Sequence, residues 1–204
     1  MVKTAQTLTL GLILVGTRGQ RQVTVLVRDS AKLNISHKNL TILTGNVLDE
    51  ATLTNSMKGK DAILSALGRG KTLKSSNLMT KAVTNLISCM KNTNVDRIIL
   101  LSAFGVRKTF VQANFIQKLI FRTFLINIYS DKTKADAMLH NSSFDWTLVY
   151  LVVLTNDPGT GNYKAGESLP MKGIPKISRA DVADFMLQQL TDNTYLKKTA
   201  VLMS

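Results

Sequence analysis

Short apolar runs rich in β-branched residues alternate with longer stretches of helical periodicity along this chain. The apolar runs predict strands over residues 23–27, 40–43, 62–65, 98–102 and 146–150, and a further edge strand over residues 200–203. The intervals between the main runs are long enough for crossover helices rather than hairpins, which favours a parallel sheet. The pattern therefore predicts an α/β fold, and we expect residues 1–204 to form a single domain.

Three segments carry helix signals. Residues 75–93 can begin on Ser75 or Ser76 and would bury one face, made of Met79, Val83, Leu86 and Met90. A shorter helix opens at Asp49-Glu50 and ends near Gly59. Residues 178–181 read Ser-x-x-Asp, which predicts a capped late helix whose buried face is Val182, Phe185, Met186 and Leu190.

The charge and cysteine content indicate which kind of binding partner and which cellular compartment to expect. The 26 Lys and Arg residues against 13 Asp and Glu give a net charge of +13, which favours an anionic partner such as a nucleotide, nucleic acid or a phospholipid headgroup. With Cys89 as its one cysteine, the chain has no internal disulfide, which fits a reducing compartment. We therefore expect a cytoplasmic protein.

The apolar run at residues 8–15 precedes everything else. It is too short to span a bilayer, it contains Gly11, and no A-x-A-like cleavage site follows it. We interpret it as a buried strand or a helix remnant rather than a signal or an anchor.

Six motifs then occur in a recognisable order: VTVLVRDSAKL, LTGNVLDEATL, DAILSALG, NLISCMKNTNVDRIILLSAFGV, SSFDWTLVY and ISRADVADFML. This series resembles that of atypical short-chain dehydrogenase/reductases, and with LTNDPGTGNYKAG near residues 154–166 it is most similar to the flavin reductase/biliverdin reductase-like group. The resemblance covers roughly residue 22 to the C-terminus. It implies a Rossmann-like fold, NADPH or NADH as cofactor, and hydride transfer to a flavin, tetrapyrrole or quinone-like acceptor.

The opening of the chain departs from that family. A first strand followed by G-x-x-G-x-x-G normally lets the backbone approach pyrophosphate at a helix N-terminus. Here residues 4–9 and Gly11 stand near that place, while Gly16 and Gly19 come directly before the second strand and predict a surface turn. We therefore expect a shortened or incomplete first strand and phosphate loop, uncovered groups on the neighbouring strands, and weak NADPH binding. Two smaller departures are Asn46, in place of the acidic residue of the G-D-V pattern, and Leu151, in place of a proline.

Arg28 is the foremost candidate for cofactor recognition. It follows the strand at residues 23–27, where a guanidinium can bind an adenosine 2′-phosphate with help from Lys32, as the resemblance implies. The alternative is a solvated Arg28 paired with Asp29. The resemblance gives further cofactor contacts at Val47, Ala66, Leu67 and Gly68, although Gly68 alone could simply end a strand.

Ser102 is the catalytic candidate. It ends the run IILLS, and the resemblance gives it the role of orienting the nicotinamide or the acceptor. It is not a nucleophile, because no motif places a histidine beside it. The Tyr-x-x-x-Lys pair of ordinary short-chain dehydrogenases is absent, since Tyr129 is followed by Lys132 and Lys134. Hydride transfer would therefore depend on proximity, with the proton coming from water.

Residues 104–129 contain five of the seven phenylalanines among basic residues, which predicts a helical lid over a planar acceptor. The aromatic residues could equally be core, and a membrane-surface or nucleic-acid contact is a third interpretation that no motif supports. Two histidines and one cysteine form no ligand cluster, so we expect no metal. The predicted function is an NAD(P)H-dependent reductase, and the alternative is a non-catalytic relative, either a redox sensor or a degenerate copy.

Overall fold

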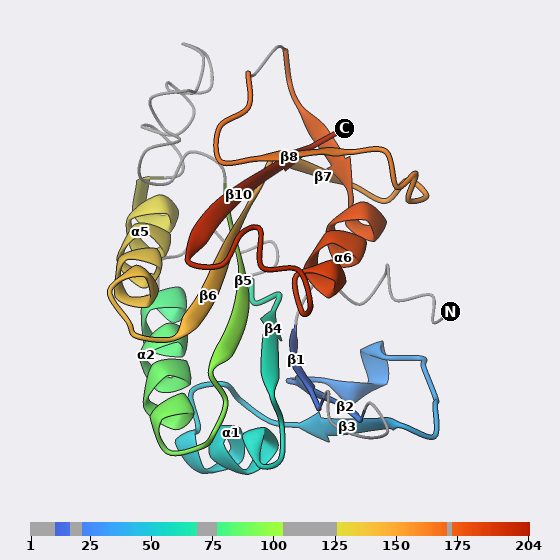
Figure 1. Cartoon of the computed structure of the whole chain (residues 1–204). Helices are drawn as coiled ribbons and strands as arrows, with labels where there is room; N and C mark the ends of the chain where they lie inside the picture. Colours follow the sequence, from blue (N-terminus) through green and yellow to red (C-terminus); the bar gives the residue numbers. More distant parts are fainter. Residues whose placement is uncertain (1–10, 17–21, 69–76, 104–125, 171–172) are drawn as a thin grey trace.

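The computed structural model describes residues 11–16, 22–68, 77–103, 126–170 and 173–204. Eight strands form one sheet in the order β3-β2-β1-β4-β5-β6-β10-β8, and β7 pairs with β9 in a second, two-stranded sheet (Figure 1). The strands are β1 (Gly11–Val15), β2 (Val23–Val27), β3 (Leu40–Thr44), β4 (Ala62–Ser65), β5 (Arg97–Ala103), β6 (Asp145–Leu151), β7 (Val153–Thr155), β8 (Lys164–Gly166), β9 (Lys176–Ser178) and β10 (Lys198–Met203). The predicted strands are confirmed, with shifts of one or two residues at some ends.

The helices cover both faces of the large sheet. They are η2 (Ser30–Lys32), α1 (Glu50–Met57), α2 (Leu78–Lys91), α5 (Ile126–His140) and α6 (Arg179–Gln188). Figure 1 shows α1, α2 and α5 on one face and α6 on the other. This three-layer arrangement confirms the predicted Rossmann-like class. None of these helices is both long and apolar enough to cross a membrane.

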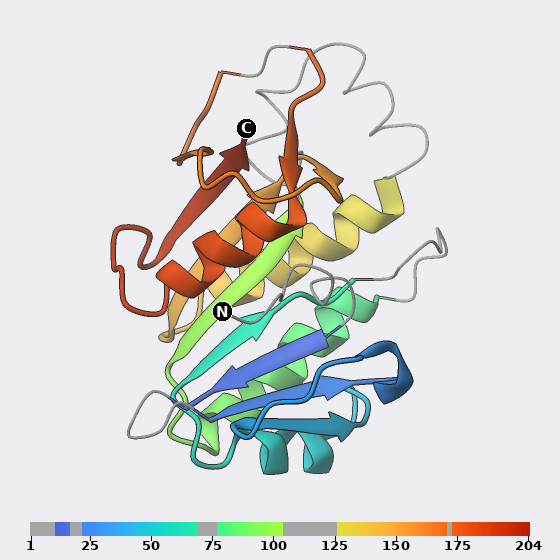
Figure 2. The same cartoon turned by 90° about the vertical axis from the view of Figure 1, so that its right-hand side faces the viewer.

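Strand β1 runs against its neighbours. It pairs antiparallel with β2 on one side and with β4 on the other, while β2–β3, β4–β5, β5–β6 and β6–β10 are parallel. Figure 2 shows the arrow of β1 pointing opposite to those of its two neighbours. The strand interpretation of the apolar run at residues 8–15 is therefore confirmed for Gly11–Val15. The expectation of uncovered groups on the neighbouring strands is wrong, because β1 pairs with the ladders on both sides.

Chain length explains the reversed direction. Only residues 16–22 lie between β1 and β2, and the turn is closed by a hydrogen bond from the Gly16 amide to the Gln22 carbonyl at 2.9 Å. Parallel neighbours need a crossover of about a dozen residues or more, whereas antiparallel neighbours need only a short loop. With so short a connection, β1 can lie beside β2 only in the antiparallel direction.

Strand β10 also differs from its prediction. It lies between β6, with which it is parallel, and β8, with which it is antiparallel, so it is an interior strand and not an edge. The three residues of β8 form the actual edge. The apolar residues at 200–203 correctly indicate a buried strand, but they do not indicate which strands pair with it.

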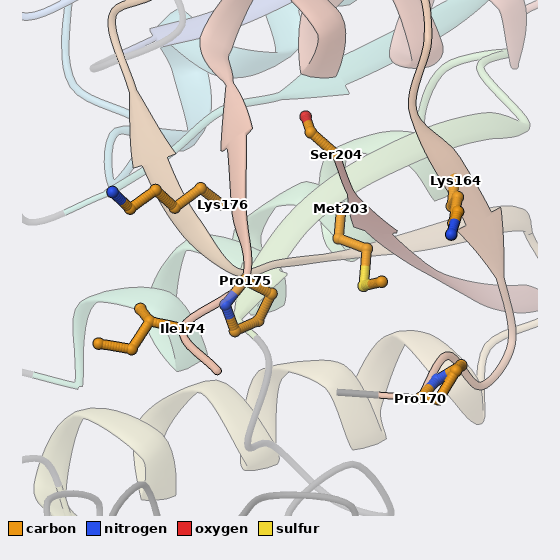
Figure 3. Close-up of a pocket in the computed structure, with 7 residues that line it drawn as sticks. All are labelled: Lys164, Pro170, Ile174, Pro175, Lys176, Met203 and Ser204. Carbon is orange, nitrogen blue, oxygen red and sulfur yellow. The ribbon is translucent and has the colours of Figure 1, made fainter. Parts of the chain in front are cut away.

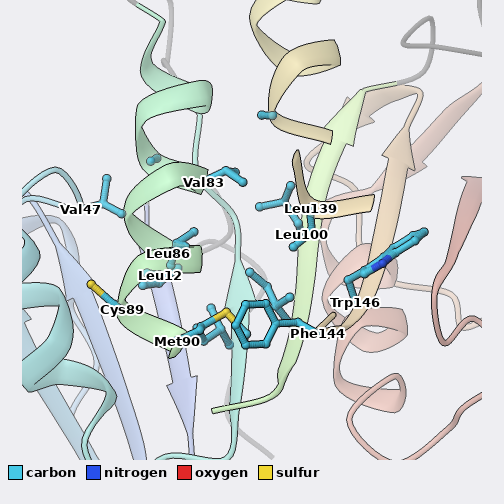
Figure 4. Close-up of a cluster of buried hydrophobic side chains, with 14 of the residues drawn as sticks. Leu12, Val47, Val83, Leu86, Cys89, Met90, Leu100, Leu139, Phe144 and Trp146 are labelled. Carbon is cyan, nitrogen blue, oxygen red and sulfur yellow. The ribbon is translucent and has the colours of Figure 1, made fainter. Parts of the chain in front are cut away.

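The core divides into two clusters, one on each face of the sheet. Figure 4 shows the cluster on the face covered by α2 and α5. The predicted buried face of α2 is confirmed, since Met79, Val83, Leu86 and Met90 are all at most 2% exposed. On the other face, α6 buries Val182, Phe185 and Met186, while Leu190 is partly buried against the same cluster. Both faces of the sheet are therefore closed by packed apolar side chains, which leaves the strand ends as the place for a site.

Candidate functional site

The predicted cofactor contacts gather at one edge of the sheet. Arg28 follows β2, Val47 lies just beyond β3, residues 66–68 follow β4, and Ser102 is near the end of β5. These strands are parallel apart from the intervening β1, so their carboxyl ends lie at the same edge. The order β3-β2-β1-β4-β5-β6 is that of dinucleotide-binding sheets, whose ligands bind where the order reverses, here at β1 and β4.

Arg28 is exposed at this edge. The neighbouring carboxylate of Asp29 accepts the amide of Ala31 at 3.1 Å and so caps the short helix η2. Lys32 closes that helix, and its side chain lies outside the part of the chain that the structure describes. The geometry leaves Arg28 accessible to an anionic ligand, and its role stays a prediction.

The Gly-Asn-Val turn after β3 serves packing first. A Cβ at Gly45 would lie 2.6 Å from Thr52 Cγ2 and 2.9 Å from Leu26 Cδ1, so a larger residue there would force these side chains of α1 and β2 to shift. Val47 is 9% exposed, and its carbonyl accepts a hydrogen bond from Asn85 Nδ2 at 3.3 Å. The side chain of Val47 therefore belongs to the core.

Residues 66–68 leave β4 in three different environments. Ala66 is buried on the α6 face, and Leu67 packs against the cluster on the opposite face. A Cβ added at Gly68 would meet no atom of the described residues within 4 Å. Gly68 is therefore the one of the three with open space beside it, as a closely approaching ligand requires.

Ser102 belongs to a buried polar cluster that the sequence did not reveal. Its hydroxyl donates to Asp136 Oδ2 at 2.9 Å, and the Tyr150 hydroxyl donates to the same oxygen at 2.9 Å. The three residues are 3%, 1% and 2% exposed, respectively. Asp136 is five residues beyond Asp131 on α5, and a pair of inward-facing aspartates on an otherwise basic segment is the sequence signal that could have indicated a cluster.

The N-termini of α1, α2 and α6, positions of the kind at which this fold usually binds anions, are capped by side chains of the chain itself. Asp49 accepts the amides of Ala51 and Thr52 at the start of α1, at 3.1 and 3.4 Å, and the pKa of Asp49 is lowered chiefly by its hydrogen bond from the Thr52 hydroxyl. At α6, Ser178 accepts the amide of Asp181 at 3.0 Å, which confirms the predicted cap.

Helix α2 takes its cap from a distant element. The predicted caps Ser75 and Ser76 lie outside the described residues, and the residue at the N-cap position, Asn77, makes no side-chain cap. Instead, buried Asp131 of α5 accepts the amides of Met79 and Thr80 at 3.0 and 2.9 Å. A phosphate at this terminus would have to displace a carboxylate.

A dinucleotide therefore fits this chain unevenly. The ends of β2 and β5 offer a cation and a hydroxyl for the two ends of the ligand, and Gly68 offers space. In the described residues, however, β1 ends at the opposite edge and leads into β2 rather than into a helix. Among the described residues, none forms at that position the glycine turn and helix N-terminus that normally hold pyrophosphate.

The motif at residues 154–166 has a structural role. Asp181 Oδ1 accepts the amides of Thr160 and Gly161, both at 2.8 Å, and Asp181 Oδ2 accepts the Ser178 hydroxyl at 2.8 Å. Nearby, the Tyr163 hydroxyl donates to Asp184 at 3.1 Å, and burial together with that carboxylate raises the pKa of Tyr163 far above its usual range. The loop is thus fastened to the start of α6.

A pocket of about 540 Å³ lies where β8, β9 and β10 meet (Figure 3). Its lining combines apolar groups with two lysines on opposite sides of Pro175 and Met203: Lys164, Pro170, Ile174, Pro175, Lys176, Met203 and Ser204. Ile174 is 72% exposed. The pocket lies at the same sheet edge as Ser102, because β10 is parallel to β6 and β6 to β5.

Two predictions fall partly or wholly outside these observations. The lid phenylalanines Phe104, Phe110, Phe115, Phe121 and Phe124 lie outside the described residues. Within the described ranges, no group of three or more His, Cys, Asp or Glu residues could hold a metal ion.

The family follows from a direct match. Residues 12–193 match the model of a family described as NAD(P)H-binding. The chain belongs to this NAD(P)H-binding family. Membership confirms the predicted reductase-like family and its cofactor class, a nicotinamide dinucleotide. It also confirms the general prediction of an NAD(P)H-dependent oxidoreductase, without naming the acceptor.

Solved structures show the same fold. The anaerobilin reductase ChuY of Escherichia coli O157:H7 has a TM-score of 0.73 at 18% identity, over 90% of this chain and 85% of that one. The oxidoreductase ylbE of Lactococcus lactis has a TM-score of 0.71 at 19% identity, over 88% and 78%. A short-chain dehydrogenase/reductase of Veillonella parvula, solved in complex with NADP, has a TM-score of 0.64 at 19% identity, over 83% and 75%. At identities below 20%, these similarities show that the NAD(P)H-binding family member shares the fold of each structure.

Proposed function

We propose that this protein is an NADPH-dependent reductase that acts on a planar anionic acceptor such as a flavin, and that it binds its cofactor weakly. The observation that carries the proposal is the convergence of Arg28, Gly68 and Ser102 on the carboxyl edge of the sheet, around the switch in strand order. When bound, the reduced nicotinamide supplies the hydride. The residues of the chain bind and orient the reactants.

The charge distribution supports an anionic ligand. Three of the acidic residues, Asp131, Asp136 and Asp181, are at most 2% exposed, so their charges are buried while the chain carries a net charge of +13. Arg28 is exposed at the sheet edge, and its planar guanidinium suits the adenosine 2′-phosphate. For the acceptor, the pocket of Figure 3 offers an apolar surface between two lysines, which suits a planar body with acidic groups. The structural similarity to ChuY, an anaerobilin reductase, is in keeping with such an acceptor.

The cofactor assignment is tested by calorimetric titration of wild-type and Arg28→Ala protein with NADPH and with NADH. Loss of a charge-assisted phosphate contact costs about 1.5–3 kcal/mol, so NADPH affinity should fall roughly 10- to 150-fold while NADH affinity changes little. Lys38→Ala is the matched control, because Lys38 is an exposed cation on the loop before β3, at the amino edge of the sheet. Equal losses for the two nucleotides, or no loss, would refute the role of Arg28.

The reversed β1 favours a second candidate function, a nucleotide-binding relative without turnover. Without the glycine turn, the pyrophosphate loses the backbone amides that normally hold it, and the nicotinamide would be less firmly placed. Steady-state oxidation of NADPH in the presence of flavin separates the two candidates. Nucleotide binding without oxidation, for flavin and for tetrapyrrole acceptors alike, would favour the non-catalytic function.

The weakness of binding has its own test. Replacing residues 1–21 by a complete strand, a G-x-x-G-x-x-G turn and a helix should restore a parallel β1 and raise NADPH affinity. Tight binding by the present chain, without that replacement, would show that its own residues hold pyrophosphate in another way.

A further inference from the structure

Asp136 accepts two hydroxyl protons on a single oxygen. Ser102 and Tyr150 each donate to Oδ2 at 2.9 Å, and none of the three residues is more than 3% exposed. Hydrogen bonds to an ionised carboxylate are roughly twice as strong as bonds between neutral groups, and burial strengthens them further. In both bonds the hydroxyl donates and the Asp136 oxygen accepts.

The three residues come from three different elements. Ser102 and Tyr150 are register partners on the parallel strands β5 and β6, so their side chains stand next to each other on the same face. Asp136 comes from α5, which covers that face (Figure 1). Their common location is the carboxyl end of β5, at the edge where the proposed cofactor contacts gather.

The bond to Asp136 determines what Ser102 can offer a ligand. A serine hydroxyl has one proton to donate and two lone pairs that accept. The proton is used by Asp136, and within the described ranges no donor reaches the Ser102 oxygen. Ser102 is therefore a hydroxyl whose remaining capacity is that of an acceptor.

We infer that Asp136 is a positioning residue that makes Ser102 a hydrogen-bond acceptor for the carboxamide N–H of the nicotinamide. The inference rests on the proposed function, because it assumes that a dinucleotide binds along this edge. It assigns a polarity to the contact: Ser102 selects a ring substituent that donates a hydrogen bond and discriminates against one that can only accept.

The 3-acetylpyridine analogue of NADP⁺ tests this polarity, because a methyl ketone replaces the carboxamide and donates no hydrogen bond. Calorimetric titration should show that wild-type protein binds NADP⁺ about three- to tenfold more tightly than the analogue, which corresponds to one net hydrogen bond. Adenosine 2′,5′-bisphosphate, which lacks the nicotinamide, serves as the control ligand. Ser102→Ala should abolish the preference and leave the affinity for the bisphosphate unchanged.

Two further variants test whether Asp136 acts through Ser102. In Asp136→Asn the amide nitrogen can donate to Ser102 and release its proton, so the preference for NADP⁺ should disappear or reverse in favour of the ketone. Tyr150→Phe keeps the bond between Ser102 and Asp136 and should keep the preference. If Asp136→Asn does not fold, Asp136→Ala removes the group that accepts the Ser102 proton, and a preference for NADP⁺ that persists in that variant would overturn the role of Asp136.

The outcomes separate the inference from the function on which it rests. A preference that survives in Ser102→Ala, or equal losses of NADP⁺ and bisphosphate affinity in Asp136→Asn, would overturn the inference alone. Absence of binding of all three ligands to wild-type protein would overturn the proposed function and the inference together.

Discussion

Removing the carboxylate that caps α2 is expected to destabilise the whole domain. Asp131 is 2% exposed and accepts the Met79 amide at 3.0 Å, the Thr80 amide at 2.9 Å and the Thr80 hydroxyl at 2.6 Å. These contacts join α5 to the first turn of α2, fifty-one and fifty-two residues earlier in the chain. The carboxylate also lies at the positive end of the α2 dipole.

The magnitude follows from the groups left without a charged partner. Hydrogen bonds to charged groups contribute about 1.5–3 kcal/mol each, and a neutral replacement recovers about 0.5–1.5 kcal/mol. In Asp131→Asn the amide oxygen can still accept one of the backbone N–H groups, but the amide nitrogen then faces another donor. We expect a net loss of about 2–4 kcal/mol in the free energy of unfolding, a large share of the roughly 5–15 kcal/mol typical of a domain.

Urea denaturation followed by circular dichroism measures this loss as a lower midpoint with an unchanged slope. Asp96→Asn is the matched control, since it removes the same charge at an exposed position and should stay within about 0.5 kcal/mol of wild type. Thr80→Ala should cost about 1 kcal/mol and combine non-additively with Asp131→Asn. If Asp131→Asn is no more destabilising than Asp96→Asn, the cap does not stabilise α2 as argued.

Three other substitutions or treatments test separate parts of the structure. Cys89 is 1% exposed, and burial raises the pKa of its thiol. A thiol reagent at pH 8 should therefore label Cys89 only as the protein unfolds, and rapid labelling of the native protein would contradict this. The free energy of unfolding should also fall as the pH rises from the pKa of the unfolded thiol toward the raised pKa of the folded one. Gly45→Ala should lower the free energy of unfolding by about 1–3 kcal/mol in chemical denaturation, because its Cβ would meet Thr52 and Leu26. Gly68→Ala, with open space around it, should change that free energy by less than about 0.5 kcal/mol. Similar values for the two variants would refute the packing argument. Asp181→Ala should speed amide hydrogen exchange at Thr160 and Gly161 and lower stability by about 2–4 kcal/mol, and unchanged exchange at those two amides would show that the loop is held elsewhere.

Local sequence determined the strands and the buried faces of helices. The run at residues 62–65 coincides with β4, and the face of α2 that its periodicity predicts is fully buried. Period 2 and period 3.6 record which side of an element meets the core, and that information lies within the element itself. The Ser-x-x-Asp cap of α6 is equally local, since its partners are three residues apart.

The direction of β1 was also encoded, but in the length of a connection rather than in a motif. An apolar run, a glycine-containing turn and the strand Val23–Val27 follow each other closely at residues 8–27. Read as a hairpin, this spacing predicts an antiparallel β1.

The order of strands beyond β6 and the buried polar contacts were decided only by tertiary structure. The sequence of β10 shows that it is buried but not that it lies between β6 and β8, because pairing depends on how the chain returns across the sheet. The caps and clusters of Asp131 and Asp136 join residues 14 to 52 positions apart, and no periodicity records such distances. The sequence by itself determined that this chain folds as a mostly parallel sheet of the NAD(P)-binding type. The packing of α5 against α2, β5 and β6 decided where Asp131 and Asp136 of α5 lie. A carboxylate is stable in the core only beside hydrogen-bond donors, and here other elements supply those donors.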